Sequence, residues 1–148
     1  MTCIAYDGRT VCADRFFQTC SGDKMMRLGD RIIAVTGSPS LLHMVEEYFT
    51  NGGILNLEDN YVLVVDVTTG KARMYLDEME WFEVDSPIAI GTGYPYAMAA
   101  MLGGADAERA VEIAGMLDPA TKTIWGTTVF QVNPVSGSKK AKAQKKRL

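Results

Sequence analysis

The sequence has few of the residues on which common active sites are built. Its 148 residues include one histidine and three cysteines. Cys3, Cys12 and Cys20 lack the paired spacing of a zinc site and are too few for a disulfide framework. The only histidine, His43, follows two leucines on the polar side of a predicted helix, so we expect it at the surface. A Ser-His-Asp or Cys-His site is therefore not supported. We expect no cofactor and no metal.

Long hydrophobic runs are also missing. Charged side chains interrupt the apolar stretches near the N-terminus, and runs such as YVLVV are too short to cross a bilayer. We therefore expect a cytoplasmic protein with no membrane partner. Hydrophobic residues make up 47% of the chain, and the mean hydropathy is near zero. This composition is typical of one globular domain with its own core.

Basic residues are scarce in most of the chain and abundant at its end. Residues 1–138 hold all 18 acidic residues and nine of the 15 basic ones, whereas residues 139–147 hold the other six basic residues. We predict one domain over residues 1–135 and a basic, disordered tail over residues 136–148. A nucleic-acid-binding arm is the alternative interpretation of the tail. Because no aromatic residues alternate with the lysines, we favour a solvated tail.

Hydrophobic patterning and turn residues predict an α+β fold. We expect a hairpin over residues 2–13 with Asp7-Gly8 as a two-residue turn, which would place Cys3 opposite Cys12. That pair would form either a cross-strand bridge or, as we favour, two reduced thiols. The remaining predicted elements are strands near 24–28 and 31–36, a helix from Ser38-Pro39 to Asn51, a meander of four short strands over 61–91, helices in YPYAMAAML and ERAVEIAGML, and a strand in TIWGTTVFQV. Such segregated blocks favour a layered fold over alternating βαβ units.

Two segments share a pattern of strand, glycine turn, proline and helix: RIIAVTGSPSLLHMV and SPIAIGTGYPYAMAAML. Each pattern brings the N–H groups of a helix start to the end of a strand, where a developing oxyanion can be held. The Gly91-Thr92-Gly93 turn lacks the third glycine of a dinucleotide fingerprint, and no lysine follows it to complete a phosphate loop. We therefore do not expect a nucleotide site.

The N-terminus of the chain offers a base that does not require histidine. A terminal α-amine has a reference pKa of about 8, so an N-terminal threonine carries its own general base next to its hydroxyl. Thr2 becomes that residue if Met1 is removed. Taken alone, a threonine at a strand end is ordinarily only a β-forming residue.

Four segments in order resemble the N-terminal-nucleophile hydrolases of the proteasome β-subunit type, most closely the bacterial HslV-type peptidase subunit. They are TCIAYDGRTVCAD, KMMRL, AVTGS and IAIGTGYPYAMAAML. The resemblance implies a four-layer αββα sandwich with two antiparallel sheets between helical layers. It also implies a threonine-type peptidase for polypeptides that forms a homo-oligomeric ring and is fed by an ATP-dependent unfoldase. The alternative is a non-catalytic ring scaffold or binding module in which Met1 is retained.

The resemblance also implies a role for each matching residue. Thr2 would be the nucleophile, with its freed α-amine as proton acceptor. Lys24 would lower the pKa of the Thr2 hydroxyl, and Asp14 would hold Lys24 by a salt bridge. The alternative for Asp14 and Lys24 is an ordinary ion pair without a catalytic role.

The other implied roles lie around the nucleophile. The Gly37 N–H would donate to the tetrahedral oxyanion, and Val35 would line the pocket for the side chain before the cut bond. Thr92, which stands where the family usually has serine, would organise the terminal amine, and Asp118 would lie near the nucleophile. The segment between residues 51 and 61 is too short for the second helix of the family's first helical layer.

Overall fold

The computed structural model describes residues 2–17 and 20–132. The predicted tail over 136–148 lies outside the described residues, so the division into domain and tail stays a prediction. Within the described ranges, no helix is both long and apolar enough to cross a membrane.

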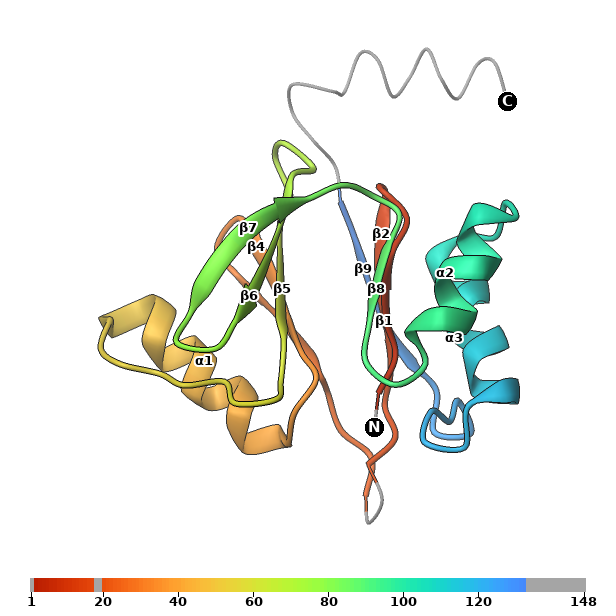
Figure 1. Cartoon of the computed structure of the whole chain (residues 1–148), viewed down its shortest axis with the longest axis horizontal. Helices are drawn as coiled ribbons and strands as arrows, with labels where there is room; N and C mark the ends of the chain where they lie inside the picture. The colour runs from red at the N-terminus through yellow and green to blue at the C-terminus, as the bar shows by residue number, and fades with distance from the viewer. Residues whose placement is uncertain (1, 18–19, 133–148) are drawn as a thin grey trace.

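Two antiparallel sheets lie face to face between helices (Figure 1). The first sheet has the order β8-β1-β2-β9, with bounds Ile88–Ile90, Ile4–Tyr6, Thr10–Asp14 and Thr127–Gln131. The second has the order β3-β4-β5-β6-β7, with bounds Met25–Leu28, Arg31–Val35, Val62–Asp66, Ala72–Leu76 and Glu80–Val84. Helix α1 (Pro39–Asn51) covers the outer face of the second sheet, and α2 (Tyr94–Leu102) and α3 (Ala107–Leu117) cover that of the first.

Three apolar clusters hold these layers together. One lies between the two sheets, one lies between the first sheet and the pair α2 and α3, and the third lies between the second sheet and α1. A strand covered on both faces alternates its side chains between two clusters, as Ala34 and Val35 do on β4. The predicted α+β, four-layer αββα sandwich is therefore confirmed.

The first hairpin turns one residue later in the chain than the sequence predicts. Tyr6 pairs with Val11, and the Asp7 N–H donates to the Thr10 carbonyl at 3.2 Å, so the turn runs through Gly8 and Arg9 instead of Asp7 and Gly8. The cause is the Asp7 carboxylate, whose Oδ1 accepts hydrogen bonds from the backbone N–H groups of Arg9 and Thr10, both at 2.8 Å. The register therefore shifts by two residues.

This shift changes which residue stands next to the start of β1. The N–H of Asp14 donates to the carbonyl of Cys3 at 3.3 Å, so Asp14 and not Cys12 is the neighbour of Cys3 across the hairpin. The predicted pairing of Cys3 with Cys12 was wrong. Both cysteines are buried and free, as the favoured interpretation expected.

The predicted meander of four strands is divided between the sheets. Strands β5, β6 and β7 follow one another in the second sheet, but β8 pairs with β1 in the first. Burial explains the crossing: Ala89 packs against the helix side of the first sheet and Ile90 against the inter-sheet core, so β8 is covered on both faces. The turn at Gly91, which follows β8, therefore lies next to the beginning of β1.

Candidate active site

Asp14, at the end of β2, is a buried carboxylate on which three groups converge. Its Oδ1 accepts hydrogen bonds from the Thr2 hydroxyl at 3.0 Å and from the Cys3 N–H at 3.0 Å. The Lys24 ammonium lies 2.9 Å from the same oxygen, and both side chains of this pair are 0% exposed. The hydroxyl of Thr2 and the charge of Lys24 are therefore held on one oxygen atom.

The position of Lys24 is set by both sheets. Its carbonyl accepts a hydrogen bond from the Val35 N–H at 2.9 Å, and its ammonium lies 4.9 Å from the centre of the Phe17 ring. Burial lowers the pKa of Lys24 below its ordinary value, against the opposing attraction of the Asp14 carboxylate. The Lys24 ammonium is thus held on the same carboxylate oxygen that accepts the Thr2 hydroxyl.

A second network holds the backbone nitrogen of Thr2. Its N–H donates to Thr92 Oγ1 at 3.3 Å, and the Thr92 hydroxyl donates to Asp118 Oδ2 at 2.8 Å. The same carboxylate oxygen accepts the Thr121 hydroxyl at 2.6 Å, while Asp118 Oδ1 accepts the N–H of Ala120 at 3.2 Å. This nitrogen would be the α-amine of a chain from which Met1 had been removed.

The carboxylate of this network is held in its ionised form. Burial by itself raises the pKa of Asp118, but hydrogen bonds from Thr121, Thr92 and the Ala120 N–H outweigh it, and the pKa lies below its ordinary value. An ionised Asp118 keeps the Thr92 hydroxyl hydrogen pointing toward itself. The lone pairs of Thr92 Oγ1 are then left for the Thr2 nitrogen.

Glycines allow the turn before α2 to touch Thr2. Gly91 has φ +96°, and a Cβ at this position would lie 2.2 Å from the Thr2 carbonyl oxygen. The N–H of Gly93 donates to that same carbonyl at 3.1 Å. A Cβ on Gly93 would lie 2.8 Å from Thr121 Oγ1, so neither glycine has room for a side chain.

A cavity of about 500 Å³ opens beside these groups, between the edges of the two sheets. It is lined by residues from both sheets and from the turns on either side: Thr36, Asp59, Asn60, Tyr61, Met74, Phe82, Ala89, Ile90, Gly91, Thr92 and Tyr94. Two of the lining residues, Gly91 and Thr92, contact Thr2, which is itself 0% exposed and does not line the cavity. Most of its lining is apolar or aromatic, which suits an apolar side chain.

Gly37 and Val35 lie where β4 runs into α1. A Cβ on Gly37 would approach Leu41 to 2.5 Å and Asn60 to 3.2 Å, so a side chain is excluded there also. The Gly37 N–H donates to none of the described residues, and its role toward an oxyanion stays a prediction. Val35 is 1% exposed and lies in the cluster beneath α1, because alternation along β4 turns it away from the cavity. The pocket role predicted for Val35 stays a prediction.

The structure thus brings Thr2, Asp14, Lys24, Thr92 and Asp118 together from distant parts of the chain. Sequence reasoning missed Thr121, which is 0% exposed and bonded to Asp118. A hydroxyl three residues after an acidic residue, as in DPAT, was the signal available.

The side chains of His43 and Cys3, which could in principle react, take no part in the site. His43 is exposed and lies 3.8 Å from Glu46, as expected. Cys3 is next to Thr2 in the chain, but burial, with the neighbouring Asp14 charge, raises the pKa of its thiol to about 12. A thiol with such a pKa is not a nucleophile at neutral pH.

No protein-family model matches the sequence, and neither does any curated protein. Solved structures do match the fold. BPH of Thiobacillus denitrificans, a bacterial proteasome homologue, aligns with a TM-score of 0.65 and 19% identity over 90% of this chain and 100% of that one, both alone and in complex with epoxomicin. A eukaryotic HslV from Trypanosoma brucei aligns with a TM-score of 0.63 and 18% identity over 89% of this chain and 98% of that one. The chain therefore has an HslV-like fold.

Proposed function

We propose that the protein is a threonine-type peptidase whose nucleophile is the hydroxyl of Thr2 after Met1 has been removed. The observation that carries the proposal is that two separate networks, one buried and one partly exposed at Thr92, hold the two functional atoms of this residue. Asp14 and Lys24 hold its oxygen, and Thr92 with Asp118 holds its nitrogen. Fixing nucleophile and base on one rigid strand end is the kind of positioning that converts a bimolecular encounter into a unimolecular step.

The proposed reaction has two stages. Thr2 Oγ1 attacks the substrate carbonyl carbon while its proton passes to the α-amine, and the Gly37 N–H donates to the resulting oxyanion. The carbon–nitrogen bond then breaks, and the leaving amine takes the proton. Water attacks the ester on Thr2 with the amine again as base, releases the carboxylic acid and restores the hydroxyl.

Each network has its own task in this scheme. Lys24 stabilises negative charge as the Thr2 hydroxyl loses its proton, and Asp14 keeps Lys24 in place. Asp118 acts through Thr92, whose oxygen accepts from the amine and so orients the lone pair of its nitrogen toward the hydroxyl. Asp118 and Thr121 are positioning residues on this proposal.

We also propose a homo-oligomeric ring in the cytoplasm, with polypeptides delivered by an ATP-dependent unfoldase. Large apolar side chains are exposed on α2, on α3 and in the loop that follows, which is typical of a surface buried in an assembly. They are Tyr94, Tyr96, Leu102, Met116, Leu117, Ile124 and Trp125. The three free cysteines fit a reducing compartment.

Intact mass spectrometry with an electrophilic inhibitor tests the peptidase proposal. The intact mass of the purified protein is measured before and after treatment with epoxomicin. The ketone and the epoxide of this inhibitor can react with a hydroxyl and an amine of the same residue. We expect loss of Met1 and one adduct equal to the full inhibitor mass, since addition to the ketone and opening of the epoxide release no atoms. Thr2→Ala should lose the adduct, and Thr2→Ser should keep it.

Either of two results in this experiment would overturn the proposal. Retained Met1 with no adduct on a folded, wild-type chain would favour the non-catalytic ring scaffold. An adduct that persists in Thr2→Ala would place the reactive group elsewhere.

A further inference from the structure

The outer face of the second sheet is covered by α1 at one end only. Helix α1 packs chiefly over β3 and β4, and the described segment after it, residues 52–61, contains no helix. The part of β5 and β6 near their connecting turn is left open. A cavity of about 240 Å³ lies there, lined by Arg31, Val64, Asp66, Thr69, Lys71, Arg73, Tyr75 and Glu83.

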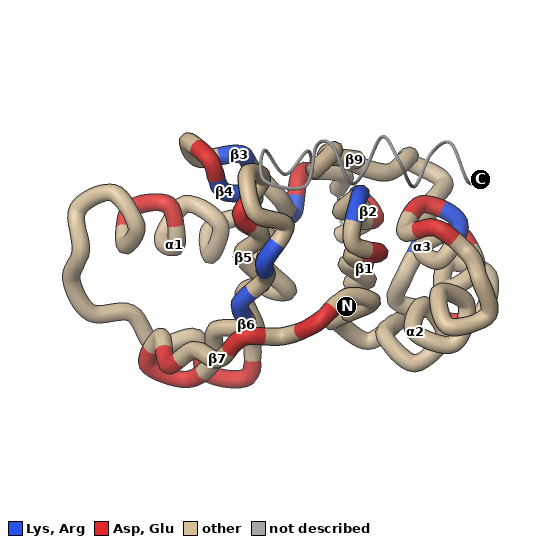
Figure 2. The backbone as a smooth tube through the Cα atoms, turned by 90° about the horizontal axis from the view of Figure 1, so that it is seen from above, with Lys and Arg blue, Asp and Glu red and all other residues tan. Residues whose placement is uncertain are grey.

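Three of the body's few basic residues meet in this cavity. Residues 1–138 hold nine basic and 18 acidic residues, and Arg31, Lys71 and Arg73 are three of the nine. Figure 2 shows the basic residues on β4 and β6, while acidic residues gather around β7. Asp66 and Glu83 also line the cavity, so they offset part of the mutual repulsion of the three basic groups, and an added anion would offset the rest.

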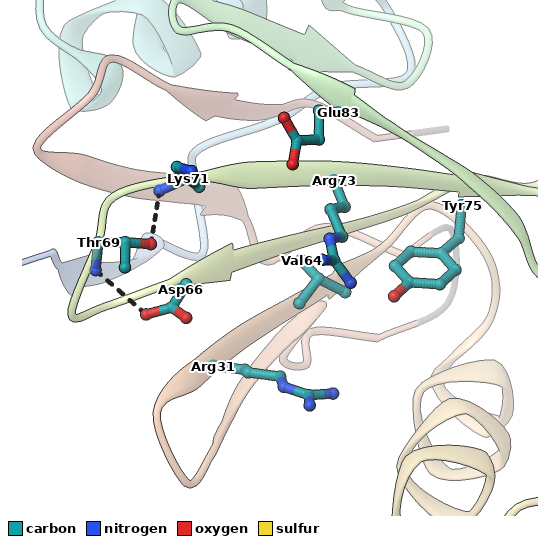
Figure 3. Close-up of a pocket in the computed structure, with 8 residues that line it drawn as sticks. All are labelled: Arg31, Val64, Asp66, Thr69, Lys71, Arg73, Tyr75 and Glu83. Atoms are coloured by element: carbon teal, nitrogen blue, oxygen red, sulfur yellow. Dashed lines mark hydrogen bonds between the residues drawn. The ribbon is translucent and has the colours of Figure 1, made fainter.

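The strand register explains how the basic groups come together. Arg31 is paired with Asp66 across β4 and β5, and Arg73 is paired with Val64 across β5 and β6. All four side chains stand on the same face of the sheet. In Figure 3 the guanidinium groups of Arg31 and Arg73 extend toward Val64 and the hydroxyl of Tyr75.

Aromatic rings hold the two guanidinium groups without using their N–H donors. Arg73 Cζ lies 3.9 Å from the centre of the Trp81 ring, and Arg31 Cζ lies 5.6 Å from that of Phe49. A ring interacts with the flat face of a guanidinium, so the N–H groups along its edge stay open to a ligand. Two forked donors held in this way match the paired oxygens of a phosphate or carboxylate.

The acidic residues of the cavity stand next to these donors but form no close ion pair with them. The pKa of Asp66 lies below its ordinary value chiefly because the Thr68 hydroxyl donates to it, and the charge of Arg31 contributes. Within the described part of the chain, no carboxylate oxygen lies within 4.0 Å of a charged nitrogen of Arg31, Lys71 or Arg73. Asp66 Oδ1 accepts from the hydroxyl and N–H of Thr68 and from the N–H of Thr69. Glu83 is paired with Arg73 across β6 and β7, and Figure 3 marks no hydrogen bond between the two side chains.

We propose that Arg31, Lys71 and Arg73 form a binding site for a small polyanionic ligand that carries phosphate or several carboxylate groups. The two guanidinium forks bind its oxygens, the Lys71 ammonium adds a point charge, and the Tyr75 hydroxyl supplies a further donor. The site lies on the face of the sheet opposite the inter-sheet core. It does not depend on the peptidase proposal.

Isothermal titration of the full-length protein with inorganic phosphate, pyrophosphate and citrate tests the site. We expect saturable binding that is tightest for pyrophosphate or citrate, with Trp81 fluorescence changing in parallel; the preferred anion identifies a phosphate or a carboxylate ligand. Arg31→Gln and Arg73→Gln should each weaken binding about tenfold or more, because each removes a charge-assisted pair. Glu83→Gln should tighten binding, because it removes a negative charge from the cavity lining.

Arg27→Gln is the matched control. Arg27 lies on β3 of the same sheet, outside the cavity, and its Nε donates to the Gly29 carbonyl at 3.0 Å. This variant loses the same charge and should bind as the wild type does. Absence of saturable binding for all three anions would overturn the proposal. Equal weakening by Arg27→Gln and Arg73→Gln would do so too, since it would mean that only net charge matters.

Discussion

Replacing Lys24 with methionine should destabilise the folded protein by about 3–5 kcal/mol, the usual cost of breaking a buried ion pair from one side. At 2.9 Å and an effective dielectric constant of about 20, the attraction between Lys24 and Asp14 is about 6 kcal/mol, part of which the burial of both charges offsets. Methionine keeps the length of the buried side chain, so the cavity left behind is small. The Thr2 hydroxyl and the Cys3 N–H still donate to Asp14, which favours the lower end of the range.

Urea unfolding at pH 7 and one fixed protein concentration measures this cost. The free energy of unfolding of a domain of this size is about 5–15 kcal/mol. The variant should therefore remain folded in water, and its urea midpoint should be clearly lower than that of the wild type. The double variant with Asp14→Asn should be less destabilised than the sum of the two single variants, because the second change removes the charge that the first left unpaired.

Arg109→Met is the matched control for this experiment. Arg109 forms an exposed pair with Glu112 at 3.8 Å, and its loss should cost less than about 1 kcal/mol. If Lys24→Met lowers the free energy of unfolding no more than Arg109→Met does, the buried ion pair contributes no more to stability than an exposed one. The electrostatic role proposed for Lys24 would then lose its basis.

Three further predictions test other parts of the site. Gly91→Ala should lower the free energy of unfolding in urea by more than about 4 kcal/mol and abolish adduct formation, because the added methyl meets the Thr2 carbonyl. Gly104 also has a positive φ but faces open space, so Gly104→Ala should lower it by only about 1–2 kcal/mol. Iodoacetamide should label only Cys20 in the native protein and all three cysteines in urea, which peptide mass mapping measures. The reason is that burial raises the thiol pKa of Cys3 and of Cys12 to about 12. The stabilisation from ionised Asp118 should be fully present above pH about 4 and lost as the pH falls through its lowered folded-state pKa. The stability difference between the wild type and Asp118→Asn should therefore shrink on acidification, and a difference that grows instead would contradict this assignment.

Local signals determined where most elements begin and end. The proline after Ser38 and the glycine at position 52 set the bounds of α1, and Gly29-Asp30 set the β3–β4 turn, as the sequence predicts. These signals act through the φ angles and hydrogen-bonding groups of neighbouring residues, so they are readable without a partner strand. The same is true of the order of the blocks, from which the layered α+β fold follows.

The candidate nucleophile and its charged neighbours could also be predicted, but from the resemblance of four segments and not from any single residue. Thr2, Asp14 and Lys24 each have an ordinary structural interpretation when taken alone. Their meeting on one carboxylate oxygen depends on a hairpin register that the Asp7 side chain shifted by two residues. Sequence patterning fixes which face a residue is on, since a shift of two keeps the face, but it does not fix the neighbour across the strand.

Only the tertiary structure decided which residues surround the Thr2 nitrogen. Strand β8 leaves the sheet of β7 to pair with β1, which brings Thr92 to the nitrogen of Thr2, 90 residues away in the sequence. Thr121 joins through Asp118, and Val35 turns from the cavity to the layer under α1. The sequence by itself determined the elements and the chemistry available at the chain end. Which side chains meet there depends on contacts between distant segments, whose geometry follows from packing the layers and not from any local pattern.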